Sequence, residues 1–252
     1  MTARSDAGSP RPVTSPEVPP APRQPLTLSG LAFAGLLLVA WFLSGGDAPD
    51  YTAADDAWTT WAGANRVRSG VGGFVILLAG LALLHFAGTI RGALATTQEN
   101  VARSTHLARV AVAGAVVGGT GIAMAIVMVG ATTSEGSQAD PLVSRAVMTA
   151  ATGPYLVAAM GFAALLGSAG LLTVRHGPLP RWTGVVALVG ALAFVIPFLT
   201  LIAGTGKDSA FGYGFLPGIL ALATWSSATS IASYRRSTSP RQASALMLGT
   251  EP

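Results

Sequence analysis

The sequence predicts an all-α fold: a polytopic membrane protein whose six transmembrane helices form one bundle. Hydrophobic residues make up 51% of the 252 residues and charged residues only 10%, whereas a soluble domain carries about 25% charged residues. The 15 basic and 11 acidic residues all fall outside six long apolar stretches. Each stretch is close to or above the roughly 20 residues that a helix needs to cross a bilayer. The expected spans are 26–44, 70–90, 110–131, 146–174, 182–203 and 210–234.

Two tails flank the expected transmembrane domain, which covers residues 26–236. Residues 1–25 are rich in Pro, Ser and Arg, and residues 237–252 are similar in composition. Segments of this kind cannot bury an apolar core, so both tails are expected to be disordered. The loops between the spans are too short for a separate soluble domain.

The distribution of the basic residues predicts the orientation. Eleven lie in the two tails and in the second and fourth loops, and four lie in the first, third and fifth loops. Cytoplasmic loops carry an excess of Lys and Arg. Both termini are therefore expected in the cytoplasm, with the chain in a bacterial cytoplasmic (inner) membrane.

The first outer loop is expected to contain a helix that starts near residue 53 and runs into the second span. Thr52 and Asp55 have the spacing of a capping box. A bend is expected in the glycine-rich segment 70–73. Trp58 and Trp61 are three residues apart, which favours an aromatic belt at the outer interface and leaves a ligand-stacking pair as the alternative.

The third to sixth spans contain residues that predict close helix packing or a kink in a helix. Gly114 and Gly118 have the four-residue spacing that lets two helices approach closely, either inside the monomer, which is favoured, or in a dimer. Asp140 before Pro141 predicts a helix start. Prolines inside helical patterns predict kinks in the fourth, fifth and sixth spans, at Pro154, Pro197 and Pro217.

Polar candidates for a site are few. His85 is the one imidazole inside a span, and the sixth span ends in a hydroxyl-rich run that includes Ser227, Ser230 and Tyr234. The predicted topology places all four in the cytoplasmic half, where they are candidate ligand-binding residues of a polar cavity, together with hydroxyls such as Thr89, Ser168 and Thr173. Hydrogen bonding between helices is the simpler interpretation of the hydroxyls. A neutral, hydrogen-bonded imidazole is the simpler interpretation of His85, and a metal or haem ligand is its alternative.

The sequence lacks the residues that several classes of protein function require. The chain has no cysteine, which excludes disulfides, iron–sulfur clusters and thiolate zinc sites. No catalytic motif occurs, and no span contains a carboxylate, so no catalytic residue, metal site or cofactor is predicted. The net charge of +4 comes from scattered topogenic arginines, so nucleic acid is not an expected partner. The expected partners are the lipid bilayer and a possible membrane protein.

A family resemblance adds to this picture. It rests on Tyr51–Ala95 with its GVGGF segment, on Leu179-Pro180-Arg181-Trp182-Thr183-Gly184, and on Trp225 followed by Arg235-Arg236. Together these segments resemble uncharacterised six-span membrane proteins, common in actinobacteria, that form a domain-of-unknown-function family. The resemblance covers about residues 26–236. It implies the six-helix fold and the inner membrane, and it implies no catalytic residues.

The expected function is that of a non-enzymatic accessory or interaction protein. The alternative is a small transporter or lipophilic-ligand binder that uses a cytoplasm-facing polar cavity near His85. A haem-binding redox protein is a third hypothesis.

Overall fold

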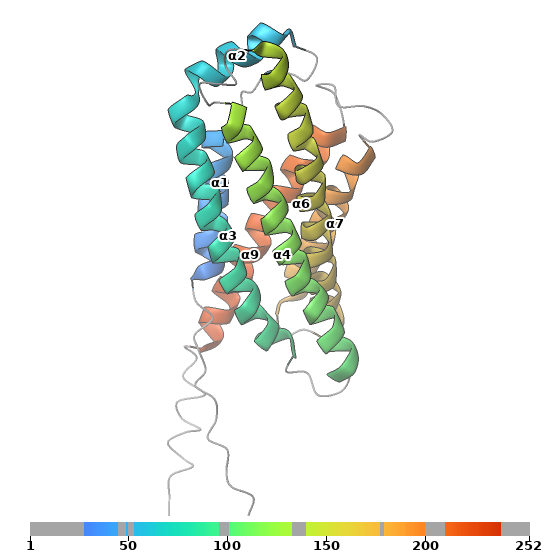
Figure 1. Ribbon diagram of the computed structural model, residues 1–252. Helices are drawn as coiled ribbons and strands as arrows, with labels where there is room; N and C mark the ends of the chain where they lie inside the picture. Colours follow the sequence, from blue (N-terminus) through green and yellow to red (C-terminus); the bar gives the residue numbers. More distant parts are fainter. Residues whose placement is uncertain are drawn as a thin grey trace, which may run out of the picture.

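The computed structural model describes residues 28–44, 49, 53–95, 101–132, 140–176, 179–199 and 210–237, and all its elements in these ranges are helical (Figure 1). The tails expected at 1–25 and 237–252 lie outside the described residues, apart from Ser237. The helices are α1 (Ser29–Ser44), α2 (Asp55–Ala64), α3 (Arg66–Ala95), α4 (Val101–Thr132), α6 (Pro141–His176), α7 (Arg181–Val195), the 3₁₀ helix η2 (Ile196–Leu199) and α9 (Ala210–Ser237).

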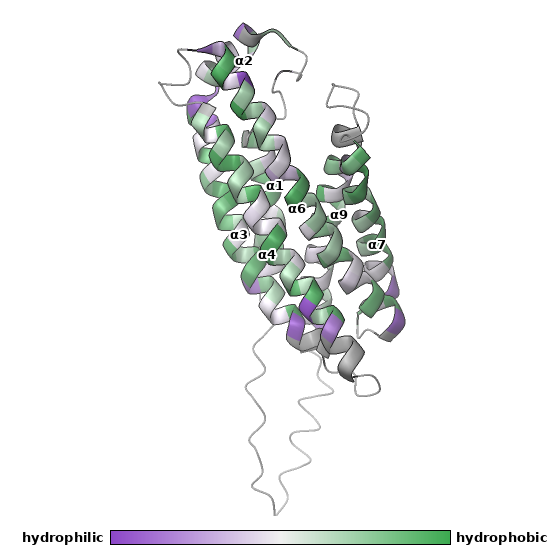
Figure 2. Cartoon of the chain, turned by 45° about the vertical axis from the view of Figure 1, so that its right-hand side comes forward, coloured by the Kyte–Doolittle hydropathy of each residue, from purple (hydrophilic) through white to green (hydrophobic). Residues whose placement is uncertain are grey.

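Five segments are long and apolar enough to cross a membrane: Arg66–Arg91, His106–Ala131, Pro141–Arg175, Arg181–Leu199 and Phe215–Arg235. The outer surface supports this class. Leu81, Val127, Met160 and Leu192, on four different helices, are each more than half exposed, and apolar colour covers the middle of the helices in Figure 2. Soluble monomers rarely expose large contiguous apolar surface. The helices therefore have the length, composition and exposed apolar surface of a multi-pass membrane protein.

The helix α1 is apolar but shorter, with 16 residues. At 1.5 Å per residue it is about 24 Å long, somewhat less than the roughly 30 Å of a hydrocarbon core. It lies along α3 and α9 within the bundle (Figure 1). Five of the expected spans are thus helices with the length and composition to cross a membrane, and the sixth span, at α1, stays a prediction.

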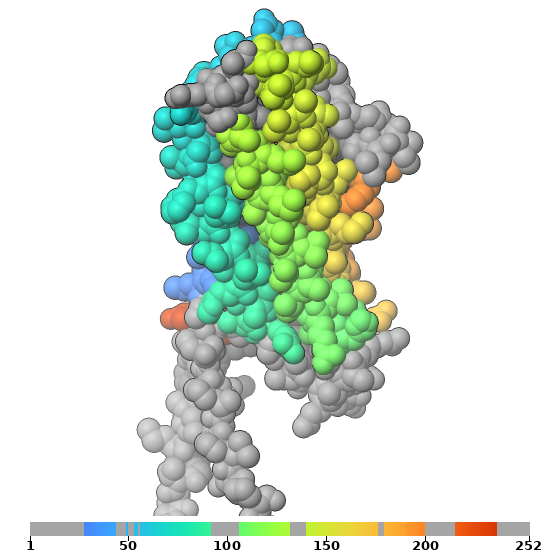
Figure 3. Space-filling view, in the orientation of Figure 1, coloured from blue at the N-terminus to red at the C-terminus, as the bar shows by residue number. Residues whose placement is uncertain are grey.

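Six helices form a closed ring in chain order. Each of α1, α3, α4, α6, α7 and α9 contacts the next, and α9 closes the ring against α1. Figure 3 shows α3, α4 and α6 side by side on one face of the molecule.

Aromatic side chains fill the middle of this ring. The ring of Phe215 lies 5.8 Å from that of Phe194 and 5.6 Å from that of Tyr155. Phe162 contacts Phe194 at 5.4 Å. The centre is therefore a packed core of aromatic rings held by several helices.

Glycines bring α4 and α6 into close contact. A Cβ atom on Gly114 would lie 2.6 Å from the carbonyl oxygen of Gly161, and one on Gly121 would lie 2.6 Å from the backbone nitrogen of Ala158. Gly118 faces the ring of Phe162 in the same seam. The predicted small-residue interface is confirmed as a contact inside the monomer.

The helix expected in the first outer loop is present as α2, but its boundaries differ from the prediction. It begins at Asp55 after Ala54, which makes no side-chain cap, so the capping box at Thr52 is wrong. The break before α3 lies at Asn65 instead of the glycines at 70–73. The Asn65 side-chain amide donates to the carbonyl oxygen of Trp61 at 2.9 Å, and this local bond competes with continuation of the helix.

Trp58 and Trp61 are buried, with exposed fractions of 2% and 9%. Their rings meet edge to face at 6.5 Å, and both pack against a cluster that includes Met148 and Val129. The expectation of a belt open to the interface is therefore wrong. These residues attach α2 to α4 and α6.

The start of α6 agrees with the sequence prediction, and the kinks at Pro154 and Pro217 stay predictions. The helix α6 begins at Pro141, and the Leu142 N–H donates to the Asp140 carboxylate at 2.9 Å. Both α6 and α9 remain α-helical on either side of Pro154 and Pro217. At Pro197 the chain changes more, because α7 ends at Val195 and a 3₁₀ helix contains the proline.

Candidate functional site: a groove between three helices

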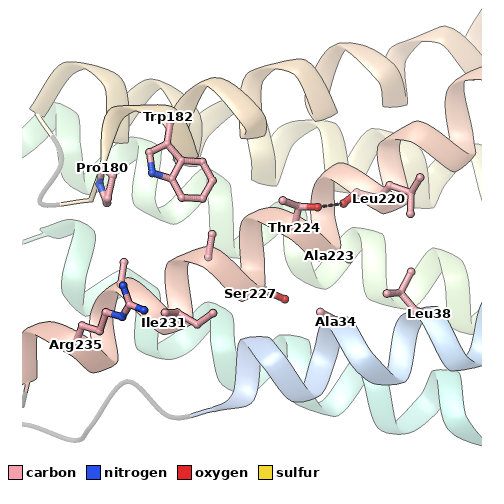
Figure 4. Close-up of a pocket in the computed structure, with 12 residues that line it drawn as sticks. Ala34, Leu38, Pro180, Trp182, Leu220, Ala223, Thr224, Ser227, Ile231 and Arg235 are labelled. Carbon is pink, nitrogen blue, oxygen red and sulfur yellow. Dashed lines mark hydrogen bonds between the residues drawn. The ribbon is translucent and has the colours of Figure 1, made fainter.

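A groove lies on the outer side of α9, between α1 and α7 (Figure 4). Its volume is about 730 Å³, within the range of about 300–1,000 Å³ that is typical of ligand pockets. Most of its lining is apolar. The lining residues are Ala34, Leu38, Pro180, Trp182, Leu220, Ala223, Thr224, Ser227, Ala228, Ile231, Ala232 and Arg235.

Local sequence explains the walls of the groove. The helix α7 starts directly after Pro180, where the Thr183 hydroxyl donates to the Pro180 carbonyl oxygen at 2.8 Å. This start directs Trp182 toward α9, and its side chain remains 54% exposed. On the floor, alanines such as Ala228 and Ala232 leave room that larger side chains would fill.

Few polar groups face the groove. The Thr224 hydroxyl donates to the Leu220 carbonyl oxygen of its own helix at 2.7 Å, as drawn in Figure 4. Ser227 is half-buried and points toward α1. Arg235 lies at the end of the groove near Pro180 and Trp182. The polar end and the apolar body of the groove are thus separate.

The opposite face of α9 carries a buried polar cluster. Trp225 and Thr229 have no exposed surface, and Ser230 is 2% exposed. Within the described residues, the indole Nε1 and the two hydroxyl oxygens have no hydrogen-bond partner. Trp225 packs edge to face on Phe86 at 5.5 Å.

The helix α1 covers this cluster at Gly30. A Cβ atom there would lie 2.7 Å from the Ser226 carbonyl oxygen and 2.8 Å from Phe86, and it would also clash with the Ser230 hydroxyl. Such a close approach is possible only for glycine. Neither Trp225, Thr229 nor Ser230 is among the residues that line the groove.

The structure brings together only some of the predicted site residues. Ser227 lines the groove, whereas Ser230 lies in the buried cluster. Tyr234 is 52% exposed and is not among the lining residues. His85 is exposed on α3, and no residue of α3 lines the groove. The expected convergence of His85 with the hydroxyls of the sixth span is not observed in the described structure.

Other predicted hydroxyls are bonded within their own helices. Thr89 donates to the Phe86 carbonyl oxygen and Thr173 to that of Ala169, each at 2.8 Å. Ser168 is buried. Both bonds lie within one helix, so the expected hydrogen bonding between helices is not observed for the two threonines. Among the described residues no group of three or more His, Cys, Asp or Glu side chains could hold a metal ion.

The sequence-based search missed the residues that form the groove. In the sequence, Trp182 and Arg235 belong only to the segments that carry the family resemblance, and Ala34 and Leu38 give no polar signal. A Trp at the start of one helix and an Arg at the end of another could have indicated a shared membrane surface. Their proximity, however, depends on the contact between α7 and α9, which no local pattern specifies.

The fold and the groove define a class: a helical multi-pass membrane protein with a recess on its outer surface. Comparisons with protein-family models, with curated proteins and with solved structures give no match. The resemblance to the uncharacterised six-span family stays a prediction.

Proposed function

We propose that this chain is a non-enzymatic, six-span protein of the bacterial cytoplasmic membrane that binds a lipophilic ligand in the groove between α1, α7 and α9. The observation that carries the proposal is the groove itself, which is of ligand size and mostly apolar. It opens on the surface of the bundle that would face the lipid. A molecule could enter it laterally from the bilayer without crossing an aqueous phase.

The orientation is part of the proposal. With both termini in the cytoplasm, α1 crosses the membrane as the first of six spans, and the Arg235 end of the groove faces the cytoplasm. The excess of bases at that end supports this orientation. The packed aromatic core supports binding over transport, because Phe194 and Phe215 occupy the centre of the ring.

Photolabelling tests the binding site. We expect a fatty acid that carries a diazirine in its chain to label peptides of α1, α7 and α9 in the purified protein. The substitution Ala228→Phe should reduce this labelling several-fold because the new ring occupies the floor of the groove.

Two controls lie outside the groove. Ala113→Phe adds the same ring to an exposed position of α4, and His85→Ala removes the exposed imidazole of α3. Both should leave the labelling unchanged. Labelling spread evenly over all helices, or loss of labelling in His85→Ala, would contradict the proposed site.

A second candidate function is that of an accessory protein for another membrane protein. A smaller apolar recess of about 260 Å³ between α3 and α4 favours it, because Gly80 and Gly119 line it. Small residues on a membrane-facing surface allow another helix to approach closely. Copurification in mild detergent of a stoichiometric partner that a Gly80→Leu variant no longer retains would support this candidate.

A further inference from the structure

The groove has two chemically different ends. Arg235, Pro180 and Trp182 lie at one end, and Leu38 and Leu220 lie at the other (Figure 4). Arginine is always charged, and its guanidinium binds phosphate through several N–H donors. Tryptophan is enriched at the level of lipid headgroups. The groove is therefore amphipathic along its length, as a membrane lipid is.

The groove is long enough to hold a lipid chain. Its floor follows α9 from Leu220 to Arg235, which is about 22 Å of helix at 1.5 Å per residue. One leaflet contributes about 15 Å of hydrocarbon, half of a core of roughly 30 Å. A headgroup at Arg235 would thus let one acyl chain run along the groove to the middle of the membrane.

The charge distribution selects the kind of lipid. The described bases at the Arg235 end of the bundle include Arg91, Arg175 and Arg181, which lie at or near the ends of α3 and α6 and at the start of α7. The described acids Asp55, Asp56 and Asp140 lie at the opposite end, where α2 and α6 begin, together with the bases Arg66, Arg68 and Arg145. A negative headgroup at Arg235 therefore meets positive charge and no described carboxylate. Basic pockets between transmembrane helices bind anionic headgroups in this way.

We infer that the ligand of the groove is an anionic glycerophospholipid of the bilayer. One acyl chain lies on α9 between α1 and α7, the phosphate contacts Arg235, and the indole of Trp182 lies beside the glycerol region. This inference rests on the proposed function, because it names the ligand of the same groove.

The other possible occupants are less well matched. A helix of a second copy would need a continuous apolar surface, and Arg235 interrupts it at one end. A zwitterionic lipid would fill the apolar body equally well but would gain less from the concentration of bases.

The experiment compares two phospholipid probes in nanodiscs of phosphatidylcholine. One is a phosphatidylglycerol and the other a phosphatidylcholine, each with a diazirine in the acyl chain. In the wild type we expect the anionic probe to label the groove peptides about fivefold more than the zwitterionic probe, the effect of about one favourable charge contact.

Three variants separate the contributions. Arg235→Gln should abolish the preference but retain labelling of the groove by both probes. Arg91→Gln removes an exposed arginine from the same end of the bundle but outside the groove, and it should keep the preference. Ala228→Phe should reduce labelling by both probes.

The outcomes are distinguishable. Equal labelling of the groove by both probes in the wild type would overturn the anionic ligand and leave the binding groove intact. A groove that neither probe labels would overturn both proposals, and cross-links from groove residues to a second copy would assign it to a dimer instead. A preference lost equally in Arg91→Gln would mean that bulk surface charge, and not Arg235, attracts the lipid.

Discussion

Glycine residues decide where the backbones of this bundle meet. Between α4 and α6, Gly114 faces the backbone of Gly161 and Leu165 at distances that leave no room for a side chain. In a bilayer, helix association depends on close packing because lipid chains are as apolar as leucine. Even the smallest side chain at Gly114 would separate α4 from α6, and we therefore expect it to lower the stability of the protein.

Gly114→Ala should destabilise the protein by about 1–3 kcal/mol, the usual cost of overpacking a well-packed site. The new Cβ would lie 2.6 Å from the Gly161 carbonyl oxygen, so α4 and α6 must separate. Thermal unfolding in detergent would show a lower midpoint for the variant.

A matched control lies on the same helix. At Gly130 a Cβ atom meets nothing within 4 Å, so Gly130→Ala should be neutral or slightly stabilising because alanine favours the helix. Equal midpoints for the two variants would show that the seam is not as close as described.

At the scale of elements, α2 differs from the other helices. Its ten residues lie across the end of the bundle where α3 begins and α6 starts (Figure 1). Its attachment depends on Trp58 and Trp61, which pack on Met148 and Ala151 of α6. The tryptophans therefore hold a short helix on the rim of the bundle.

Trp58→Ala should cost about 3 kcal/mol, the lower part of the range for truncating a large buried aromatic residue. Trp58 is 2% exposed, whereas Thr60 on the same helix is exposed, so Thr60→Ala serves as the control. The free energy of unfolding in detergent, measured for both variants, checks this. If the two variants have the same stability, α2 does not depend on the aromatic cluster.

Sequence reasoning predicted elements better than it predicted contacts. The spans followed from the absence of charge, and the start of α6 followed from Asp140 and Pro141, because these signals are local. The break at Asn65 was missed because the glycines that follow looked like the stronger signal, whereas the Asn65 side chain and backbone N–H both bond the Trp61 carbonyl oxygen. The burial of Trp58 was missed because it depends on α6, more than eighty residues away in the chain.

The candidate site was predicted less well for the same reason. Polar residues attracted attention in the sequence, and most of them prove to bond their own helix or to lie in the buried cluster. Ser227 alone of the four candidates lines the groove. The groove is formed instead by alanines, Leu38, Trp182 and Arg235, whose common position follows only from the way α9 lies between α1 and α7.

At the scale of the whole molecule, the account depends on the membrane. Five helices have the length and composition to cross it, and α1 completes the ring between α3 and α9. If α1 crosses as well, both termini lie on one side. If it does not, the N-terminus lies on the side opposite to the C-terminus.

Cysteine accessibility tests this topology most directly. The chain has no cysteine of its own, so Ser5→Cys, Ala54→Cys and Thr250→Cys each introduce a single thiol. The reagent is a membrane-impermeant maleimide, applied to intact cells and to cells opened by detergent.

We expect Ala54→Cys to be labelled in intact cells, and Ser5→Cys and Thr250→Cys to be labelled only after opening. Labelling of Ser5→Cys in intact cells would contradict the prediction that α1 crosses the membrane. Labelling of Thr250→Cys in intact cells would reverse the orientation and place the Arg235 end of the groove outside the cell.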